Sequence, residues 1–227
     1  MPVAVITGGA SGLGAATAAR LRGEGLAVAS LDLHQAQDVE LAISVDVRDA
    51  DEVEAAVDRV ERELGPIDHL LTAAGVFELS PIGGTGPEVW RRMLAIHIDG
   101  TANACRSVYR RMKERGAGSI VTIGSELGLC GDAEAAHYAA AKGAIHGFTK
   151  SLAMEAVQHG VRVNCVAPGP ADTPLLKPEM RAPEYIDSLV LKRIVRPDEV
   201  AATVAFLMLD DHNFVGQVLS PNAGAVV

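Results

Sequence analysis

The sequence has little positive charge and few cysteines, and each shortage disfavours a class of protein. Its 20 Lys and Arg residues stand against 29 Asp and Glu residues, so the net charge is −9. This sign disfavours general binding to nucleic acid or to anionic lipid. The three cysteines, Cys105, Cys130 and Cys165, lack the spacing of metal ligands, and their odd number disfavours a disulfide framework. We therefore expect free, buried thiols and no bound metal.

Long hydrophobic runs are also missing. No run reaches the roughly 18 apolar residues that a transmembrane helix needs, and the chain enters an apolar run at Val3 without the features of a signal peptide. We therefore expect a cytoplasmic protein with no membrane or nucleic-acid partner. Aromatic residues make up only 4% of the chain, but hydrophobic residues make up 48% of its 227 residues. This composition predicts one domain, residues 1–227, with a full hydrophobic core.

Short apolar runs alternate along the chain with longer, Ala-rich segments at helical spacing. Such alternation is typical of a parallel sheet that is covered by helices on both faces. The predicted strands are residues 3–7, 27–32, 41–45, 69–73, 119–124, 161–167 and 217–220. The predicted helices are residues 13–22, 50–64, 88–115, 136–159 and 197–209. Residues 168–183 contain five prolines, which predicts a long surface segment and a candidate lid.

A glycine-rich motif, Thr7-Gly8-Gly9-Ala10-Ser11-Gly12-Leu13-Gly14, follows the first predicted strand and opens the first predicted helix. This context is the one that a phosphate-binding turn requires. Gly8 permits the tight turn, Gly12 lets backbone N–H groups approach a pyrophosphate, and Gly14 allows close packing of helix on strand. The alternative is a flexible loop that binds no ligand. Such a loop would not require a strand before it, this spacing of glycines and a helix after it.

Asp32 ends the second predicted strand, where a carboxylate can accept hydrogen bonds from both adenosine ribose hydroxyls. The same carboxylate repels a 2′-phosphate. Its neighbours Leu33 and His34 carry no fixed positive charge, and Ser11 stands where a basic residue could bind that phosphate. The sequence therefore predicts NAD rather than NADP. The alternative is an ordinary exposed turn aspartate.

Asp46 and Val47 follow the third predicted strand and are candidates for contacts with the adenine amino group and ring. Aspartates at strand ends are common, so this assignment has an ordinary alternative. The stretch between Asp32 and Asp46 is too short for a crossover helix, and we expect a loop there.

Three residues form a candidate catalytic set. Tyr138 and Lys142 are four residues apart, so they share one helix face, and the ammonium can lower the pKa of the phenol. Ser125 directly follows a predicted strand, at the edge where parallel sheets bind ligands, and can hold the same substrate oxygen. A Tyr–Lys pair alone would more often be an exposed surface pair.

Together, the glycine motif, Asp32, Ser125, Tyr138 and Lys142 follow the order and spacing of the short-chain dehydrogenase/reductase family, which the chain resembles from end to end. Residues 121–125, 138–143 and 161–169 look most like the branch with 3-oxoacyl-thioester reductases and secondary-alcohol dehydrogenases.

The resemblance implies a Rossmann fold: an α/β, doubly wound, seven-stranded parallel sheet with helices on both faces. It also implies hydride transfer between a nicotinamide and a small-molecule alcohol or ketone substrate. Tyr138 would be the acid/base, Ser125 would hold the substrate oxygen, and Lys142 would bind the nicotinamide ribose. Thr173 matches the position that binds the carboxamide. The remaining expected cofactor contacts are Leu13, Ala74, Gly75, Pro168, Gly169 and Ala171.

The sequence departs from the family pattern in two places. Thr72-Ala73-Ala74-Gly75 stands where the family usually has Asn-Asn-Ala-Gly, so amide side chains that steady the central sheet are lost. His97 stands where the family has an asparagine that helps hold a helix distortion and a water-filled proton path. Histidine can donate and accept, so it is a candidate for a modified relay that titrates near neutrality. The alternative is a packed histidine with no catalytic duty.

Several functions stay open. Only Arg115 and His159 lie near the expected entrance, so an acidic carrier protein would find little attraction. NAD use also favours oxidation, and we expect a secondary-alcohol or hydroxyacyl dehydrogenase. A 3-oxoacyl-thioester (carrier protein or CoA) reductase is the alternative, and a catalytically inactive NAD-binding regulatory or scaffold protein is a third. Glu126 and Glu134 are candidates to line the pocket, although surface carboxylates are commoner.

The Ala-rich segment 136–156 can pack closely against another helix. In the resembled family this helix commonly lies at subunit interfaces, so the resemblance implies a homodimer or homotetramer. The alternative is that the same small residues pack within the subunit against the sheet.

Overall fold

The computed structural model describes residues 1–210 and 212–226, and its framework is one sheet of seven parallel strands. The strand order is β3-β2-β1-β4-β5-β6-β7. The strands are β1 (Val3–Thr7), β2 (Ala27–Asp32), β3 (Leu41–Ser44), β4 (Ile67–Thr72), β5 (Gly118–Ile123), β6 (Val161–Val166) and β7 (Val218–Leu219). This order is that of a Rossmann fold, so the expected fold class is confirmed.

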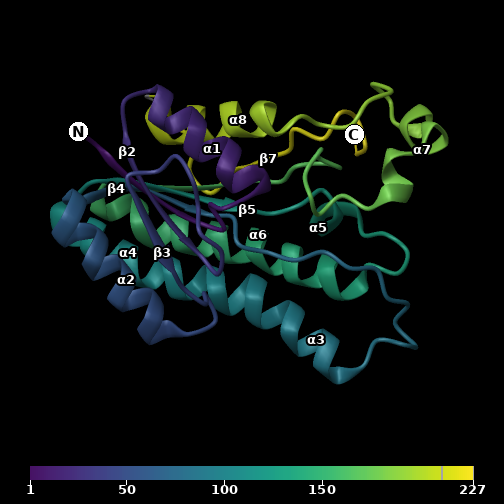
Figure 1. The fold of residues 1–227 in the computed structure, drawn as a ribbon, viewed down its shortest axis with the longest axis horizontal. Coiled ribbons are helices and arrows are strands. Elements are labelled where there is room, and N and C mark those ends of the chain that lie inside the picture. Colours follow the sequence, from purple (N-terminus) through teal and green to yellow (C-terminus); the bar gives the residue numbers. More distant parts are fainter. Residues whose placement is uncertain (211, 227) are drawn as a thin grey trace.

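Helices cover both faces of the sheet (Figure 1). On one face lie α1 (Gly12–Gly23) and α8 (Pro197–Leu209), and on the other lie α2 (Ala50–Leu64), α4 (Gly100–Arg115) and α6 (Ala136–Ala156). The side chains of β1 alternate between the two cores. Val3 and Val5 belong to the core under α2, α4 and α6, whereas Ala4 and Ile6 belong to the core under α1 and α8. A strand buried on both faces needs no polar positions, which explains its unbroken apolar run.

The helix predicted over residues 88–115 is interrupted at its centre. It consists of α3 (Pro87–Leu94), a π-helical turn η1 (Ala95–Asp99) and α4. π-Turns inside α-helices occur frequently at functional sites. This turn carries His97, so the helix distortion expected at that position is present.

Several short elements were not predicted from the sequence. These are α5 (Leu127–Cys130), α7 (Pro183–Ser188) and the 3₁₀ turn η3 (Pro178–Arg181), whereas the 3₁₀ turn η2 (Val157–His159) forms the end of the helix predicted over residues 136–159. Elements of one or two turns carry too few residues to show a hydrophobic period. The proline-rich segment 168–183 therefore contains helical turns that its composition hid.

Two other expectations have different outcomes. Residues 33–40 contain no helix, as their length predicted. The three cysteines are free, but Cys130 is exposed on α5, so its predicted burial is wrong, whereas Cys105 and Cys165 are buried.

No helix in residues 1–210 and 212–226 has the length and apolar character of a membrane span.

The site is positioned by the carboxyl edge of the sheet. β1 lies between β2 and β4, so the chain turns in opposite directions after neighbouring strands. In such sheets this point forms the ligand crevice. The loops that follow β1, β2, β4, β5 and β6 all reach this edge.

Candidate active site

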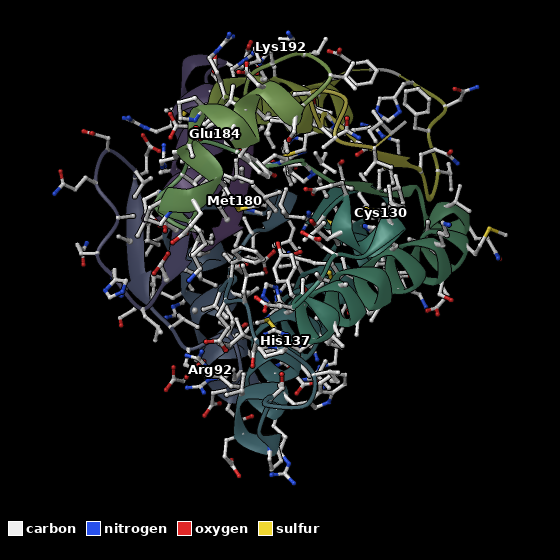
Figure 2. The ribbon with its side chains drawn as sticks, turned by 90° about the vertical axis from the view of Figure 1, so that its right-hand side faces the viewer. Arg92, Cys130, His137, Met180, Glu184 and Lys192 are labelled. Carbon is white, nitrogen blue, oxygen red and sulfur yellow. The ribbon has the colours of Figure 1, made fainter. Side chains whose placement is uncertain are left out.

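A cavity of about 580 Å³ runs along the carboxyl edge of the sheet. Every residue proposed from the sequence as catalytic or cofactor-binding lines it: Gly8, Ser11, Gly12, Leu13, Gly14, Asp32, Asp46, Val47, Ala74, Gly75, His97, Ser125, Tyr138, Lys142, Pro168, Gly169, Ala171 and Thr173. The structure thus brings together segments from the whole length of the chain. Figure 2 views this end of the molecule, with Met180 above and Arg92 below, and both side chains line the cavity.

The glycine loop is held tightly between β1 and the loop after β4. Gly8 has φ +73°, and a Cβ on it would lie 2.6 Å from the backbone nitrogen of Ala74. A Cβ on Gly14 would lie 2.1 Å from the Gly8 carbonyl oxygen. Both positions therefore exclude any larger residue. The loop is ordered further because the Ala10 N–H donates to Asp32 Oδ2 at 3.1 Å.

The end of the cavity near Asp32 contains a cation that sequence reasoning missed. Arg48 lines this end and donates through its guanidinium to the carboxylate of Asp46. Hydrogen bonding to Arg48 holds the pKa of Asp46 below its usual range. The carboxylate of Asp46 is therefore already paired, which competes with its expected contact to an adenine. The spacing of Asp46 and Arg48, two residues apart after a strand, was the available signal.

Ser125, Tyr138 and Lys142 meet at the other end. Ser125 lies just past β5, and Tyr138 and Lys142 share a face of α6, as predicted. Lys142 Nζ donates to the carbonyl oxygen of Ile123 at 2.8 Å and lies 5.7 Å from the centre of the Tyr138 ring. Ser125 and Lys142 are each 5% exposed, so both work in a largely water-free environment.

The pKa of Tyr138 shifts in the direction opposite to the one expected. Burial raises it above the usual value, the nearby carboxyl of Glu126 raises it further, and Ser125 partly opposes the rise. Burial also lowers the pKa of Lys142 to about 8, so its ammonium form still predominates at neutral pH. In the protein alone, Tyr138 therefore carries its proton at neutral pH, and desolvation is the largest cause.

His97 lies in the π-helical turn η1 between α3 and α4. Its Nε2 lies 2.9 Å from the carbonyl oxygen of Val76 and 3.3 Å from the Val76 nitrogen. One ring nitrogen can satisfy only one of these groups at a time, whereas an asparagine amide satisfies both. The ring also packs edge-on to Tyr138, with 5.4 Å between centroids.

The expectation that His97 titrates near neutrality is wrong. Burial, and then the charge of Lys142, lower its pKa to about 3. His97 is therefore neutral at physiological pH, and any role in proton transfer must use the neutral ring. Its Nδ1 is buried and has no hydrogen-bond partner among the described residues.

We predict that His97→Asn changes the pH dependence of stability. The pKa of His97 in the folded protein lies below its ordinary value of 6.5, so the unfolded wild type binds an extra proton between these values. The free energy of unfolding then falls as the pH drops from 6.5 towards 3, by up to about 1.4 kcal/mol per pH unit. His97→Asn removes this contribution, so its stability relative to wild type grows towards acid in urea titrations. His34→Asn changes an exposed histidine and serves as the control. Parallel curves for wild type and His97→Asn would contradict the prediction.

The other departure from the family pattern has a local consequence. The hydroxyl of Thr72 is buried without a partner among the described residues. The backbone of the following loop is nevertheless held, because the Ala73 N–H donates to the Thr7 carbonyl oxygen and the Ala74 N–H donates to Thr7 Oγ1. The loop beside Gly8 is thus fixed by β1 rather than by amide side chains.

The two acidic candidates separate in the structure. Glu126 is only 7% exposed, lines the cavity and accepts a hydrogen bond from Ser125. Its interpretation as a surface carboxylate is therefore wrong. Glu134 is exposed and is not among the lining residues.

Apolar side chains also line the cavity, and sequence reasoning did not identify them. Phe77 packs edge-on to Tyr138 with 4.9 Å between ring centroids. Leu175, Leu176 and Met180 come from the proline-rich segment and line the cavity. No sequence pattern marks these residues, since their positions depend on how irregular segments fold back over the sheet. The segment that was predicted as a lid thus forms one wall.

Comparison with known proteins gives matches over nearly the whole chain. A family model described as short chain dehydrogenase matches residues 2–184. The chain is 39% identical over 238 residues to cis-4-hydroxycyclohexanecarboxylate dehydrogenase of Sinomonas cyclohexanicum, which covers 98% of this chain and 95% of that protein. It is 35% identical over 234 residues to acetoacetyl-CoA reductase of Shinella zoogloeoides, covering 98% and 97%.

A solved structure agrees with these sequence matches. Ligand-free aldohexose dehydrogenase of Thermoplasma acidophilum superposes with a TM-score of 0.92 at 30% identity, covering 98% of this chain and 93% of that one. The resemblance inferred from the motifs is confirmed: the chain belongs to the short-chain dehydrogenase family of oxidoreductases.

Proposed function

We propose that the protein is an NAD-dependent oxidoreductase that transfers a hydride between nicotinamide and a secondary alcohol or ketone. The observation that carries this proposal is the meeting of Ser125, Tyr138 and Lys142 in a cavity that continues to the glycine loop and Asp32. The candidate catalytic residues and the candidate dinucleotide-binding residues thus line one cavity.

The residues at the Asp32 end fit a dinucleotide. The close packing at Gly8 and Gly14 shapes the loop, and Gly12 lines the cavity at the start of α1, where backbone N–H groups suit a pyrophosphate. Asp32 faces the cavity, and its two oxygens accept the N–H groups of Ala10 and His34. An anchored carboxylate of this kind suits two ribose hydroxyls and opposes a 2′-phosphate.

Each catalytic residue has a task that its surroundings permit. A bound nicotinamide would supply the hydride acceptor and, in its oxidised form, a positive charge that favours the phenolate. Tyr138 exchanges a proton with the substrate oxygen through its hydroxyl, and Ser125 donates a hydrogen bond to that oxygen and orients it. Lys142 is fixed by the Ile123 carbonyl, and its two other N–H groups remain available to a ribose. Its positive charge favours the phenolate form of Tyr138 and so opposes the effect of burial, which favours the neutral phenol.

We predict that Asp32→Asn weakens the preference for NAD. The amide can keep the contact with the Ala10 N–H but removes the charge that repels a 2′-phosphate. The ratio of kcat/KM for NAD over NADP is expected to fall by about 10- to 100-fold, the range for losing a charged contact. Asp38→Asn is the matched control, because Asp38 is an exposed aspartate in the same connection and lies outside the cavity lining. An unchanged ratio in Asp32→Asn would remove the argument for NAD.

The proposal is tested by following reduced nicotinamide absorbance with NAD and with NADP across secondary alcohols, cyclic diols and hydroxyacyl thioesters. Turnover of alcohols with NAD is the expected result. The hydroxyacyl thioesters test whether the protein acts on the kind of substrate named for the acetoacetyl-CoA reductase relatives. Tight NADH binding without turnover of any substrate would favour a regulatory protein, and absence of NADH binding would overturn the cofactor assignment.

A further inference from the structure

Glu126 is a buried carboxyl group inside the proposed active site, and the mechanism above does not use it. It follows Ser125 directly, and its Oε2 accepts the hydroxyl proton of Ser125 at 2.7 Å. Burial is the largest influence on this group and raises its pKa, and Ser125 and the backbone N–H groups of Glu126 and Leu127 partly oppose the rise. Ser125 supplies the side-chain donor to this carboxyl group among the described residues, and a hydroxyl of a bound ligand can take over that role.

Ser125 cannot serve Glu126 and a substrate oxygen at the same time. A serine hydroxyl has one proton, and here that proton goes to Glu126, while Ser125 Oγ accepts the N–H of Leu127 at 3.1 Å. To donate to the reacting oxygen, Ser125 must turn its proton away from Glu126. Glu126, which is only 7% exposed, then loses its side-chain hydroxyl donor, which is unfavourable. The substrate oxygen and Glu126 therefore compete for one proton.

A second hydroxyl on the substrate resolves this competition. Oxygens on neighbouring carbons lie about as far apart as hydrogen-bonded oxygens, and Ser125 Oγ and Glu126 Oε2 have this separation. We propose that Glu126 selects substrates with a second hydroxyl beside the reacting carbinol, that is vicinal diols, polyols and the corresponding hydroxy ketones, by accepting that hydroxyl's hydrogen bond. The inference rests on the proposed function, because it requires Ser125 to hold the reacting oxygen.

The charges around Glu126 agree with this class of substrate. After burial, which is the largest cause in both cases, the charge of Asp132 raises the pKa of Glu126, and the charges of Glu126 and Asp132 raise the pKa of Tyr185 on α7. Figure 2 places α5, marked by Cys130, and α7, marked by Glu184, on opposite sides of this end of the molecule. An anionic group next to the carbinol would meet like charge here, whereas a hydroxyl would meet an acceptor.

The test compares paired alcohols that differ by one hydroxyl: meso-2,3-butanediol with 2-butanol, and 1,2-cyclohexanediol with cyclohexanol. Wild type is expected to have a kcat/KM about 10- to 100-fold higher for each diol than for its mono-alcohol. Glu126→Ala is expected to abolish this preference. Its kcat/KM for the diols falls by that factor, while kcat/KM for the mono-alcohols stays the same or rises because the Ser125 proton is free.

Two further variants make the test specific. Glu126→Gln keeps an acceptor oxygen without the charge and is expected to be intermediate. Glu134→Gln makes the same change at an exposed site outside the cavity lining and is expected to match wild type. NADH binding, measured for every variant, reports whether the cofactor site is intact.

The unfavourable outcomes are distinguishable. Equal losses on diols and mono-alcohols in Glu126→Ala would mean that Glu126 acts only through Ser125, and would overturn the inference. A wild type without diol preference, or a preference that persists in Glu126→Ala, would also overturn it while leaving the proposed function intact. Failure of wild type to oxidise any of the four alcohols would overturn the proposed function and this inference together.

Discussion

Tyr138→Phe is expected to lower kcat/KM for alcohol oxidation by about a thousandfold, within the range typical of general acid–base catalysis. The variant removes only the phenolic oxygen. The ring keeps its edge-on contacts with Phe77 and His97, so the shape of the cavity is preserved. No other group in the proposed mechanism can take the substrate proton, because Lys142 is already protonated at neutral pH and the Ser125 hydroxyl is too weak an acid to provide an alkoxide base.

Two measurements separate loss of chemistry from loss of structure. NADH affinity, followed by fluorescence, is expected to stay within about threefold of wild type, since ordinary changes that spare a contact cost under about 0.5 kcal/mol. Tyr109→Phe is the matched control, because Tyr109 packs against the core under α2, α4 and α6. Near-normal turnover by Tyr138→Phe would exclude tyrosine as the acid/base.

Gly8→Ala is expected to cause the second large effect, the loss of cofactor binding. A Cβ on Gly8 would lie 2.6 Å from the Ala74 nitrogen and 2.7 Å from its Cα, and φ at Gly8 is +73°. These neighbours are backbone atoms, so the loops after β1 and β4 must separate. Together, strain and displaced loops are expected to weaken NADH binding by at least about 100-fold, since backbone strain alone costs about 1–3 kcal/mol.

The matched control for this variant is Gly23→Ala. Gly23 ends α1, the helix that the loop opens, and a Cβ there would meet no atom within 4 Å. The control is therefore expected to bind NADH like wild type. Thermal denaturation of both variants shows whether Gly8→Ala is folded. A folded Gly8→Ala variant with unchanged NADH affinity would refute the assignment of this loop to cofactor binding.

The parts of the account that sequence predicted well depend on local patterns. The apolar runs of β1 and β2 are buried on both faces, so their composition marks them without knowledge of their neighbours. The glycine loop needs specific residues at fixed spacing, and Tyr138 and Lys142 share a face because of the helical repeat. All of these features can be identified from a single stretch of sequence.

The parts that were missed depend on how distant segments meet. The pKa of Tyr138 rises because of burial and then of the carboxyl of Glu126, and burial is unknown before the fold is known. His97 is neutral for the same reason. Glu126 resembled a surface residue in the sequence, yet α5, which begins at the next residue, keeps it inside the cavity. The protonation states of groups inside a site thus depend on how the chain packs and not on the spacing of residues in the sequence.

The most direct test of the central claim is transfer of a labelled hydride. The protein is incubated with NAD and a secondary alcohol that carries deuterium on the carbinol carbon, and the NADH formed is examined by NMR. We predict that deuterium appears at C4 of the nicotinamide, on one face of the ring only, and that Tyr138→Phe forms almost none. NADH without deuterium, or no NADH from any secondary alcohol that is tried, would contradict the account.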